Sequence, residues 1–214
     1  MAYQVVLLGG SNLKVMRNDR MLVERYAKCA CNVSQKIFND TGVKFTIKLF
    51  YSRALYDKEM HRKTPRWEHA ASDKNRVAIF APSVYERATS QNLDMYKATL
   101  IHEISHIFYM QTMGTYTPRW LLEGLAMNIE GRDYRKEFGW SGDPRVDHLY
   151  FAKHGKTDKD ISEFYRSSYL FTRIIINRIG LYGLSKLLLK YSTHPVKDNY
   201  ERLFGNLLKY VGKN

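Results

Sequence analysis

The chain has 214 residues, of which 44% are hydrophobic, and this length and composition suit one compact domain with a substantial core. It carries a formal net charge of +13, but Lys and Arg are spread along the whole chain without an arginine-rich tail, which favours a solvated surface over a nucleic-acid partner. No apolar run approaches the length of a membrane-spanning helix and no segment is repeated, so we expect a single domain over residues 1–214.

Residues 1–94 are predicted to form a small mixed sheet with helices, because short apolar segments alternate with a long amphipathic one. We expect strands at residues 3–8, 43–51 and 76–81, and a helix at residues 21–38. Residues 56–74 are charged and aromatic without a clean period, and are expected to form a loop or an insertion.

The start of the chain is apolar but lacks a basic region, so it is predicted to be the first strand rather than a signal peptide. Cys29 and Cys31 are two positions apart within a predicted helix, where they are poorly placed to bridge one another. We therefore expect both cysteines to be reduced, one packed and one turned outward, and the protein to be cytoplasmic.

The part from residue 95 onward, residues 95–214, is predicted to be mostly helical. Its first helix begins after Asp94, a candidate N-cap, and ends near Gly114. The apolar residues of this helix recur at the spacing of one face, which indicates that it is largely buried. Further helices are expected at residues 161–179, 183–192 and 197–211.

The first of these helices contains the sequence His102-Glu103-Ile104-Ser105-His106. Positions 102 and 106 are about one helical turn apart, so their imidazoles project from one face and can bind a single metal ion. Glu103 lies beside them without having to be a ligand. Zinc lowers the pKa of bound water to roughly 7, and an adjacent carboxylate is then a suitable general base. The alternative is a buried helix with two hydrogen-bonded core histidines.

A third ligand is required, because catalytic zinc usually has three protein ligands and one open position. Residues 118–126, Pro-Arg-Trp-Leu-Leu-Glu-Gly-Leu-Ala, predict a second helix that begins at Pro118 and turns Glu123 toward the metal. Gly124 would permit this helix to approach the first one closely. By itself Glu123 would be an ordinary surface carboxylate, but beside the preceding motif it is the favoured third ligand of Zn²⁺.

These motifs resemble the gluzincin zinc metallopeptidases, in particular the peptidase-MA-like proteins related to the M1 aminopeptidase and thermolysin catalytic domains. That family has HExxH followed by a W-L-x-E-G-x-A block whose Glu is the third zinc ligand. The tyrosine-rich residues 165–180 are similar to the helix that follows the zinc site in the family. The resemblance implies a zincin-like α+β fold, a peptide or protein substrate, and a strand that borders the cleft and pairs with substrate, which we place at residues 77–81.

The resemblance also implies a tyrosine or histidine that donates to the oxyanion formed during peptide hydrolysis. Tyr169 is preferred over Tyr165, which shares its helix face, and His148 is a further candidate. For each tyrosine the alternative is a packing role. The Gly-x-Met-Glu-Asn segment with which M1 aminopeptidases hold a free amino terminus is absent, so endopeptidase and exopeptidase activity both stay open.

Three functions are compatible with these patterns. The first is a zinc metallopeptidase in which Glu103 is the general base. The second is a catalytically inactive zincin-like binding module, and the third is a basic nucleic-acid-associated protein with a coincidental HExxH. Glu103 favours the first function, because a purely structural zinc would not need that carboxylate.

Glu130 is expected to be a charge on the helix surface.

Overall fold

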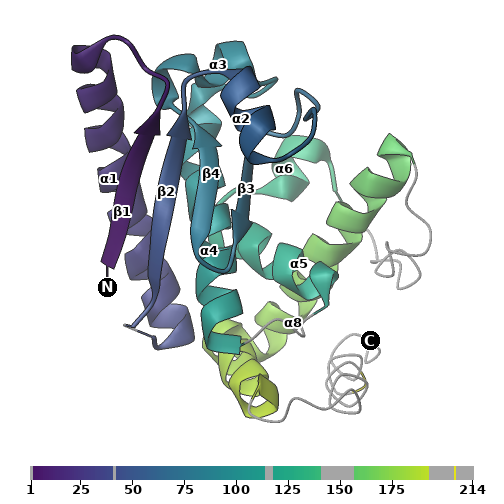
Figure 1. The fold of residues 1–214 in the computed structure, drawn as a ribbon. Coiled ribbons are helices and arrows are strands. Elements are labelled where there is room, and N and C mark those ends of the chain that lie inside the picture. Colours follow the sequence, from purple (N-terminus) through teal and green to yellow (C-terminus); the bar gives the residue numbers. More distant parts are fainter. Residues whose placement is uncertain (1, 41, 114–117, 141–156, 193–204, 206–214) are drawn as a thin grey trace. The chain divides into compact units, whose positions relative to one another are not determined.

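The chain belongs to the α+β class, with a small mixed sheet near the N-terminus and helices after it (Figure 1). The computed structural model describes residues 2–40, 42–113, 118–140, 157–192 and 205. The chain divides into two compact units, Met1–Gln111 and Thr112–Asn214. A single domain over residues 1–214 stays a prediction.

The first unit contains the four strands of the described sheet, two long helices, two short α-helices and two 3-10 turns. In chain order these are β1 (Ala2–Leu8), α1 (Leu13–Phe38), β2 (Lys44–Phe50), α2 (Arg53–Glu59), β3 (Ala70–Asp73), β4 (Arg76–Phe80), η1 (Pro82–Val84), α3 (Tyr85–Ala88), η2 (Leu93–Met95) and most of α4 (Tyr96–Met113). The described helices of the second unit are α5 (Arg119–Ile129), α6 (Tyr134–Phe138) and α8 (Asp158–Ser192).

The sheet has the strand order β1-β2-β4-β3, with the first three strands parallel and β3 antiparallel to β4. This confirms the predicted mixed sheet. Val5, Ile47 and Val77 lie side by side in the register and are almost completely buried. Because neighbouring residues of a strand point to opposite faces, this row marks one face as the core of the first unit.

Helices α1 and α4 cover that face (Figure 1). The Tyr96 hydroxyl, at the start of α4, donates to the carbonyl of Phe80 over 2.9 Å. Phe38 of α1 stacks on Phe108 of α4, with 6.4 Å between ring centroids. On the other face, Tyr56 of α2 packs its ring against Phe80 at 4.6 Å. The position of α4 is therefore set by aromatic packing and by a hydrogen bond to the end of a central strand.

Two boundaries differ from the sequence-based expectation. Helix α1 begins at Leu13 rather than at residue 21, because the Asn12 side chain accepts hydrogen bonds from the amides of Lys14 and Val15 and caps the helix earlier. Asp94 does not cap α4, since it lies inside η2, the 3-10 turn that precedes the helix. Gly114 lies outside the described residues.

The prediction of a loop or an insertion at residues 56–74 is wrong at the two ends of this segment, where α2 continues to Glu59 and β3 forms at Ala70–Asp73. The four residues of β3 become a strand by pairing with β4, from Ala70 opposite Ile79 to Asp73 opposite Arg76. Strand β4 is therefore flanked on both sides, by β2 and by β3. This corrects the expectation that residues 77–81 border the cleft and pair with substrate, because their strand is internal and β3 is the outer strand on that side.

In the second unit, α5 packs on α8 at Gly124. A Cβ atom at this position would lie 2.3 Å from both the carbonyl oxygen of Ser168 and the hydroxyl of Thr172, so only glycine allows this approach. The sequence predicted that Gly124 would allow a close approach to the HExxH helix; the partner that the structure gives to Gly124 is α8 instead. Gly180 interrupts α8 with φ 71°, which confirms the predicted division between residues 161–179 and 183–192.

Residues 197–211, predicted as a helix, fall outside the described residues except for Gly205. Within the described part of the chain, every helix is too short or too polar to cross a membrane.

Candidate metal centre

Helix α4 carries the two histidines of the HExxH motif on one side. The ring centroids of His102 and His106 are 4.6 Å apart and the rings are nearly perpendicular, at 87°. His106 is almost completely buried, and His102 is partly buried. The spacing predicted from the sequence therefore brings two imidazoles together, as the turn of an α-helix requires.

The histidines occupy a helix that is fixed at both of its ends. Near its start Tyr96 bonds to the end of β4, and near its end the Gln111 side chain bonds to the sheet at the opposite end of the strands. The Gln111 amide donates to the carbonyls of Lys44 and Lys74 over 2.8 and 2.7 Å, and its oxygen accepts from the amide of Lys44. These bonds hold the register of α4 against β2 and the β3–β4 turn.

Glu103, the predicted general base, lies between the two histidines in the sequence and is partly buried. Its carboxylate accepts a hydrogen bond from the hydroxyl of Ser72 on β3, with 2.6 Å between Oγ and Oε2. Sequence reasoning did not select Ser72. Its segment was expected to be a loop, and a contact across 31 positions leaves no periodic signal.

Glu123 belongs to α5, whose position is set by packing on α8. Gly124 lies against Ser168, and Trp120 packs edge-on against Phe171 with 4.8 Å between ring centroids. The side chain of Glu123 is only 12% exposed, whereas that of Arg119, one turn earlier and 3.7 Å away, is 60% exposed. The carboxylate of Glu123 is thus held close to the protein interior, which differs from an ordinary surface Glu.

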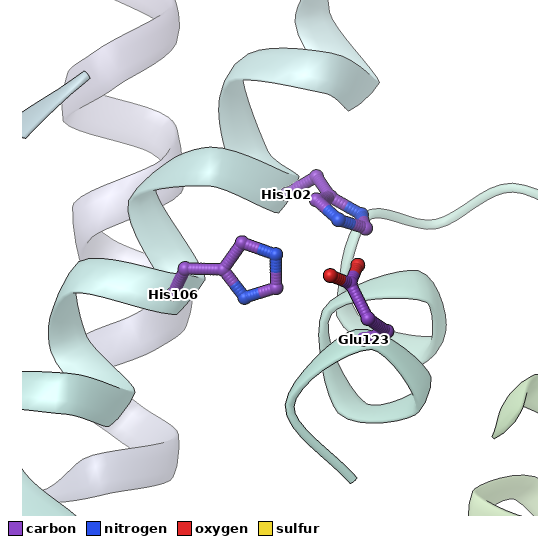
Figure 2. A group of neighbouring side chains, drawn as sticks. All are labelled: His102, His106 and Glu123. Atoms are coloured by element: carbon purple, nitrogen blue, oxygen red, sulfur yellow. The ribbon is translucent and has the colours of Figure 1, made fainter. Parts of the chain in front are cut away.

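His102, His106 and Glu123 form the group that can hold a metal ion among the described residues (Figure 2). One ligand atom from each residue lies within 4.8 Å of the others. Figure 2 shows the two imidazoles and the carboxylate gathered around a common point. Two imidazole nitrogens and one carboxylate oxygen match the donor set of a catalytic zinc site with three protein ligands.

Tyr169 and Tyr165, the predicted oxyanion donors, lie on α8. Tyr169 is 3% exposed and belongs to a buried cluster with Met127, Tyr134 and Leu170, against which Tyr165 packs. Burial, the main cause, raises the pKa of the Tyr169 phenol. A phenol is protonated at neutral pH even at its ordinary pKa, so Tyr169 has a hydrogen to donate. The oxyanion role of both tyrosines stays a prediction, and His148 lies outside the described residues.

Glu130 is not the surface charge that was expected, because it is 7% exposed. The Tyr134 hydroxyl donates a hydrogen bond to its carboxylate, and Arg132 lies 3.8 Å from the same oxygen. Burial and the Glu130 charge together raise the pKa of Tyr134. The charge of Glu130 is thus compensated locally at the end of α5, where the pattern of the helix alone suggested exposure.

Comparisons of the chain with protein-family models, with curated proteins and with solved structures found no match. The likeness to the gluzincins therefore rests on the motifs at residues 102–106, 118–126 and 165–180.

Proposed function

We propose that the chain is a zinc-dependent metallopeptidase of the gluzincin type, with a zincin-like fold. The observation that carries the proposal is the group formed by His102, His106 and Glu123, whose ligand atoms lie within 4.8 Å of one another. A carboxylate that is not part of this group, that of Glu103, follows the first histidine directly. Three ligands and a neighbouring base are the parts that metal-assisted peptide hydrolysis requires.

Zinc bound there would lower the pKa of a water molecule and polarise the carbonyl of the scissile peptide bond. Glu103 accepts a proton from the water as the water oxygen adds to the carbonyl carbon. Glu103 later delivers this proton to the leaving amine as the C–N bond breaks. Tyr169 or Tyr165 donates a hydrogen bond to the carbonyl oxygen while that atom carries negative charge. Each step thus has a residue of the chain in a named role.

The substrate we propose is an extended peptide segment, free or within a protein. Strand β3 (Ala70–Asp73) is the outer strand next to β4, and Ser72 in its middle contacts Glu103. An outer strand offers backbone N–H and C=O groups to an added strand, which is a general way to bind an extended peptide. The substrate-pairing role expected of residues 77–81 therefore passes to β3 in this proposal.

Replacing Glu103 with glutamine tests the proposed chemistry. The amide side chain would have a similar shape but could not accept the proton, so we expect Glu103→Gln to keep its zinc and to lose at least about 100-fold in turnover, the lower range for a general base. Hydrolysis of unfolded casein carrying a quenched fluorophore would be measured with one equivalent of zinc. Glu24→Gln on α1, where an exposed carboxylate pairs with Arg20, is the matched control and should match the wild type.

Full activity of the Glu103→Gln variant would show that Glu103 is not the general base. A wild type that binds zinc but hydrolyses neither casein nor a random peptide mixture would instead support the inactive binding module.

A further inference from the structure

The bond between Ser72 and Glu103 links an outer strand to the middle of the zinc-motif helix. Ser72 Oγ and Glu103 Oε2 are 2.6 Å apart, within the short range of hydrogen bonds from a hydroxyl to a carboxylate. Hydrogen bonds to ionised groups are the stronger class, and both side chains here are partly shielded from water. This contact is therefore able to hold the carboxylate in one orientation.

The backbone that carries Ser72 is itself fixed. Ser72 is paired with Val77, so its side chain lies on the sheet face that α4 covers, while Ala71 and Asp73 belong to the opposite face. Asp73 closes the turn after β3 by accepting from the amide of Asn75 at 2.9 Å and from Arg76 at 2.7 Å. The hydroxyl of Ser72 is thus presented to α4 by a short, closed hairpin.

Helix α4 contacts this hairpin at a second point. The Gln111 side chain, two helical turns after Glu103, donates to the carbonyl of Lys74 in the hairpin turn over 2.7 Å. Two contacts along the same helix prevent β3 from sliding relative to α4. The contacts within the first unit consequently keep the distance between Ser72 and Glu103 constant.

One oxygen of the Glu103 carboxylate is engaged by Ser72, and the second oxygen, Oε1, is the one that can accept a proton from water. A Glu side chain has three rotatable bonds, so a free carboxylate would sample many positions in which neither oxygen faces the reacting water. Holding a catalytic group within a narrow range of positions is a large part of how active sites gain rate.

We propose that Ser72 is a positioning residue for the general base Glu103, an inference that rests on the proposed peptidase function. Ser72 keeps its own proton throughout and acts only through Glu103. The alternative role is purely structural, a link that joins β3 to α4 without affecting catalysis.

The test compares three variants of the full chain loaded with one equivalent of zinc. Ser72→Ala removes the hydroxyl, and Ser72→Thr retains it on a residue that favours strands. Ser11→Ala, the control, removes the hydroxyl of an exposed serine between β1 and α1. For Ser72→Ala on the fluorogenic casein we expect kcat to fall about tenfold, with KM changed less than about twofold. Ser72→Thr should restore most of kcat, and Ser11→Ala should match the wild type.

A second measurement does not depend on activity. In crystal structures of metal-free wild type and variants, the Glu103 carboxylate should keep its place in Ser72→Thr and move in Ser72→Ala. An unmoved carboxylate in Ser72→Ala, a wild-type kcat for Ser72→Ala, or an equal loss in all three variants would overturn the proposal. If the zinc-loaded wild type hydrolyses nothing, the proposed function fails, and the crystal comparison still decides whether Ser72 positions Glu103.

Discussion

At the scale of single residues, the phenol of Tyr169 is the group whose proposed role is most open to test. A tyrosine hydroxyl is protonated at neutral pH even at its ordinary pKa, and burial raises the pKa of Tyr169 further, so we expect it to donate to the oxyanion. Tyr169→Phe should therefore retain zinc and lower kcat by roughly tenfold to a hundredfold, measured on the fluorogenic casein. Tyr165→Phe tests the alternative donor, and Tyr182→Phe, at an exposed position of α8, is the matched control. A wild-type rate for Tyr169→Phe with a loss for Tyr165→Phe would transfer the role to Tyr165.

The two cysteines differ in exposure, which predicts different reactivity. Both are free, as expected from the sequence, with Cys31 fully buried and Cys29 partly exposed. Burial raises the pKa of the Cys31 thiol from 9.0 to about 12, and only a thiolate is reactive. In a thiol-labelling assay at about pH 8, Cys29 should react in the folded protein and Cys31 only after unfolding. Rapid labelling of Cys31 in the folded protein would contradict this.

The raised pKa of Cys31 also gives the sign of a pH effect on stability. Between pH 9.0 and about 12 the unfolded chain binds fewer protons at Cys31 than the folded chain does. The contribution of Cys31 to the free energy of unfolding is therefore present below pH 9.0 and declines as the pH rises through this window. In Cys31→Val, the free energy of unfolding measured by denaturation should decline less across this pH window than it does in the wild type.

Residues related by helical spacing could be predicted, and those related by tertiary contact could not. His102 and His106 were predicted as neighbours because a helix fixes the distance between positions i and i+4, whatever surrounds it. Ser72 escaped prediction because its partner is 31 positions away. The burial of Glu130 depends on Tyr134 and Arg132, which fold back over it beyond the end of α5.

At the scale of elements, the contact between α5 and α8 predicts a large effect for a small substitution. In Gly124→Ala the new Cβ would lie 2.3 Å from the backbone oxygen of Ser168, which cannot rotate away, so the helices must separate. We expect a loss of about 1–3 kcal/mol in the free energy of unfolding, measured by urea denaturation, as for other overpacked sites.

Gly183→Ala on α8 is the control for this prediction. The nearest atom to its new Cβ would be the Cβ of Ile179, 3.2 Å away, a tight contact that a shift of a few tenths of an ångström relieves, and alanine is the better helix former. This variant should be within about 1 kcal/mol of the wild type. Equal stability of Gly124→Ala and the wild type would contradict the close helix contact.

The elements that were predicted correctly are those whose own sequence carries an apolar run or an apolar period. Strand β4 is a run of buried apolar residues, and α1 has a continuous apolar face over most of its length. Strand β3, with the sequence Ala-Ala-Ser-Asp, has neither pattern, and its conformation comes from pairing with β4. Because β3 was not predicted, β4 was left as the outer strand, and residues 77–81 were wrongly expected to pair with substrate.

At the scale of the whole molecule, the positive charge is spread over both units, as expected for a solvated surface. The proposed zinc ligands come from two helices that are each held by separate contacts, α4 by the sheet and α5 by α8. A metal ion that binds residues of both helices in the folded chain, and binds the unfolded chain less tightly, would also stabilise the fold.

The zinc content of the purified protein tests the central claim most directly. Elemental analysis of the wild type should give about one zinc per chain, since three protein ligands define one site. The His102→Ala, His106→Ala double variant should have lost the metal, and Glu123→Ala should hold far less of it, provided that circular dichroism shows each variant to be folded. Absence of zinc from folded wild type, even after zinc is supplied, or an unchanged content in the double variant, would contradict the account.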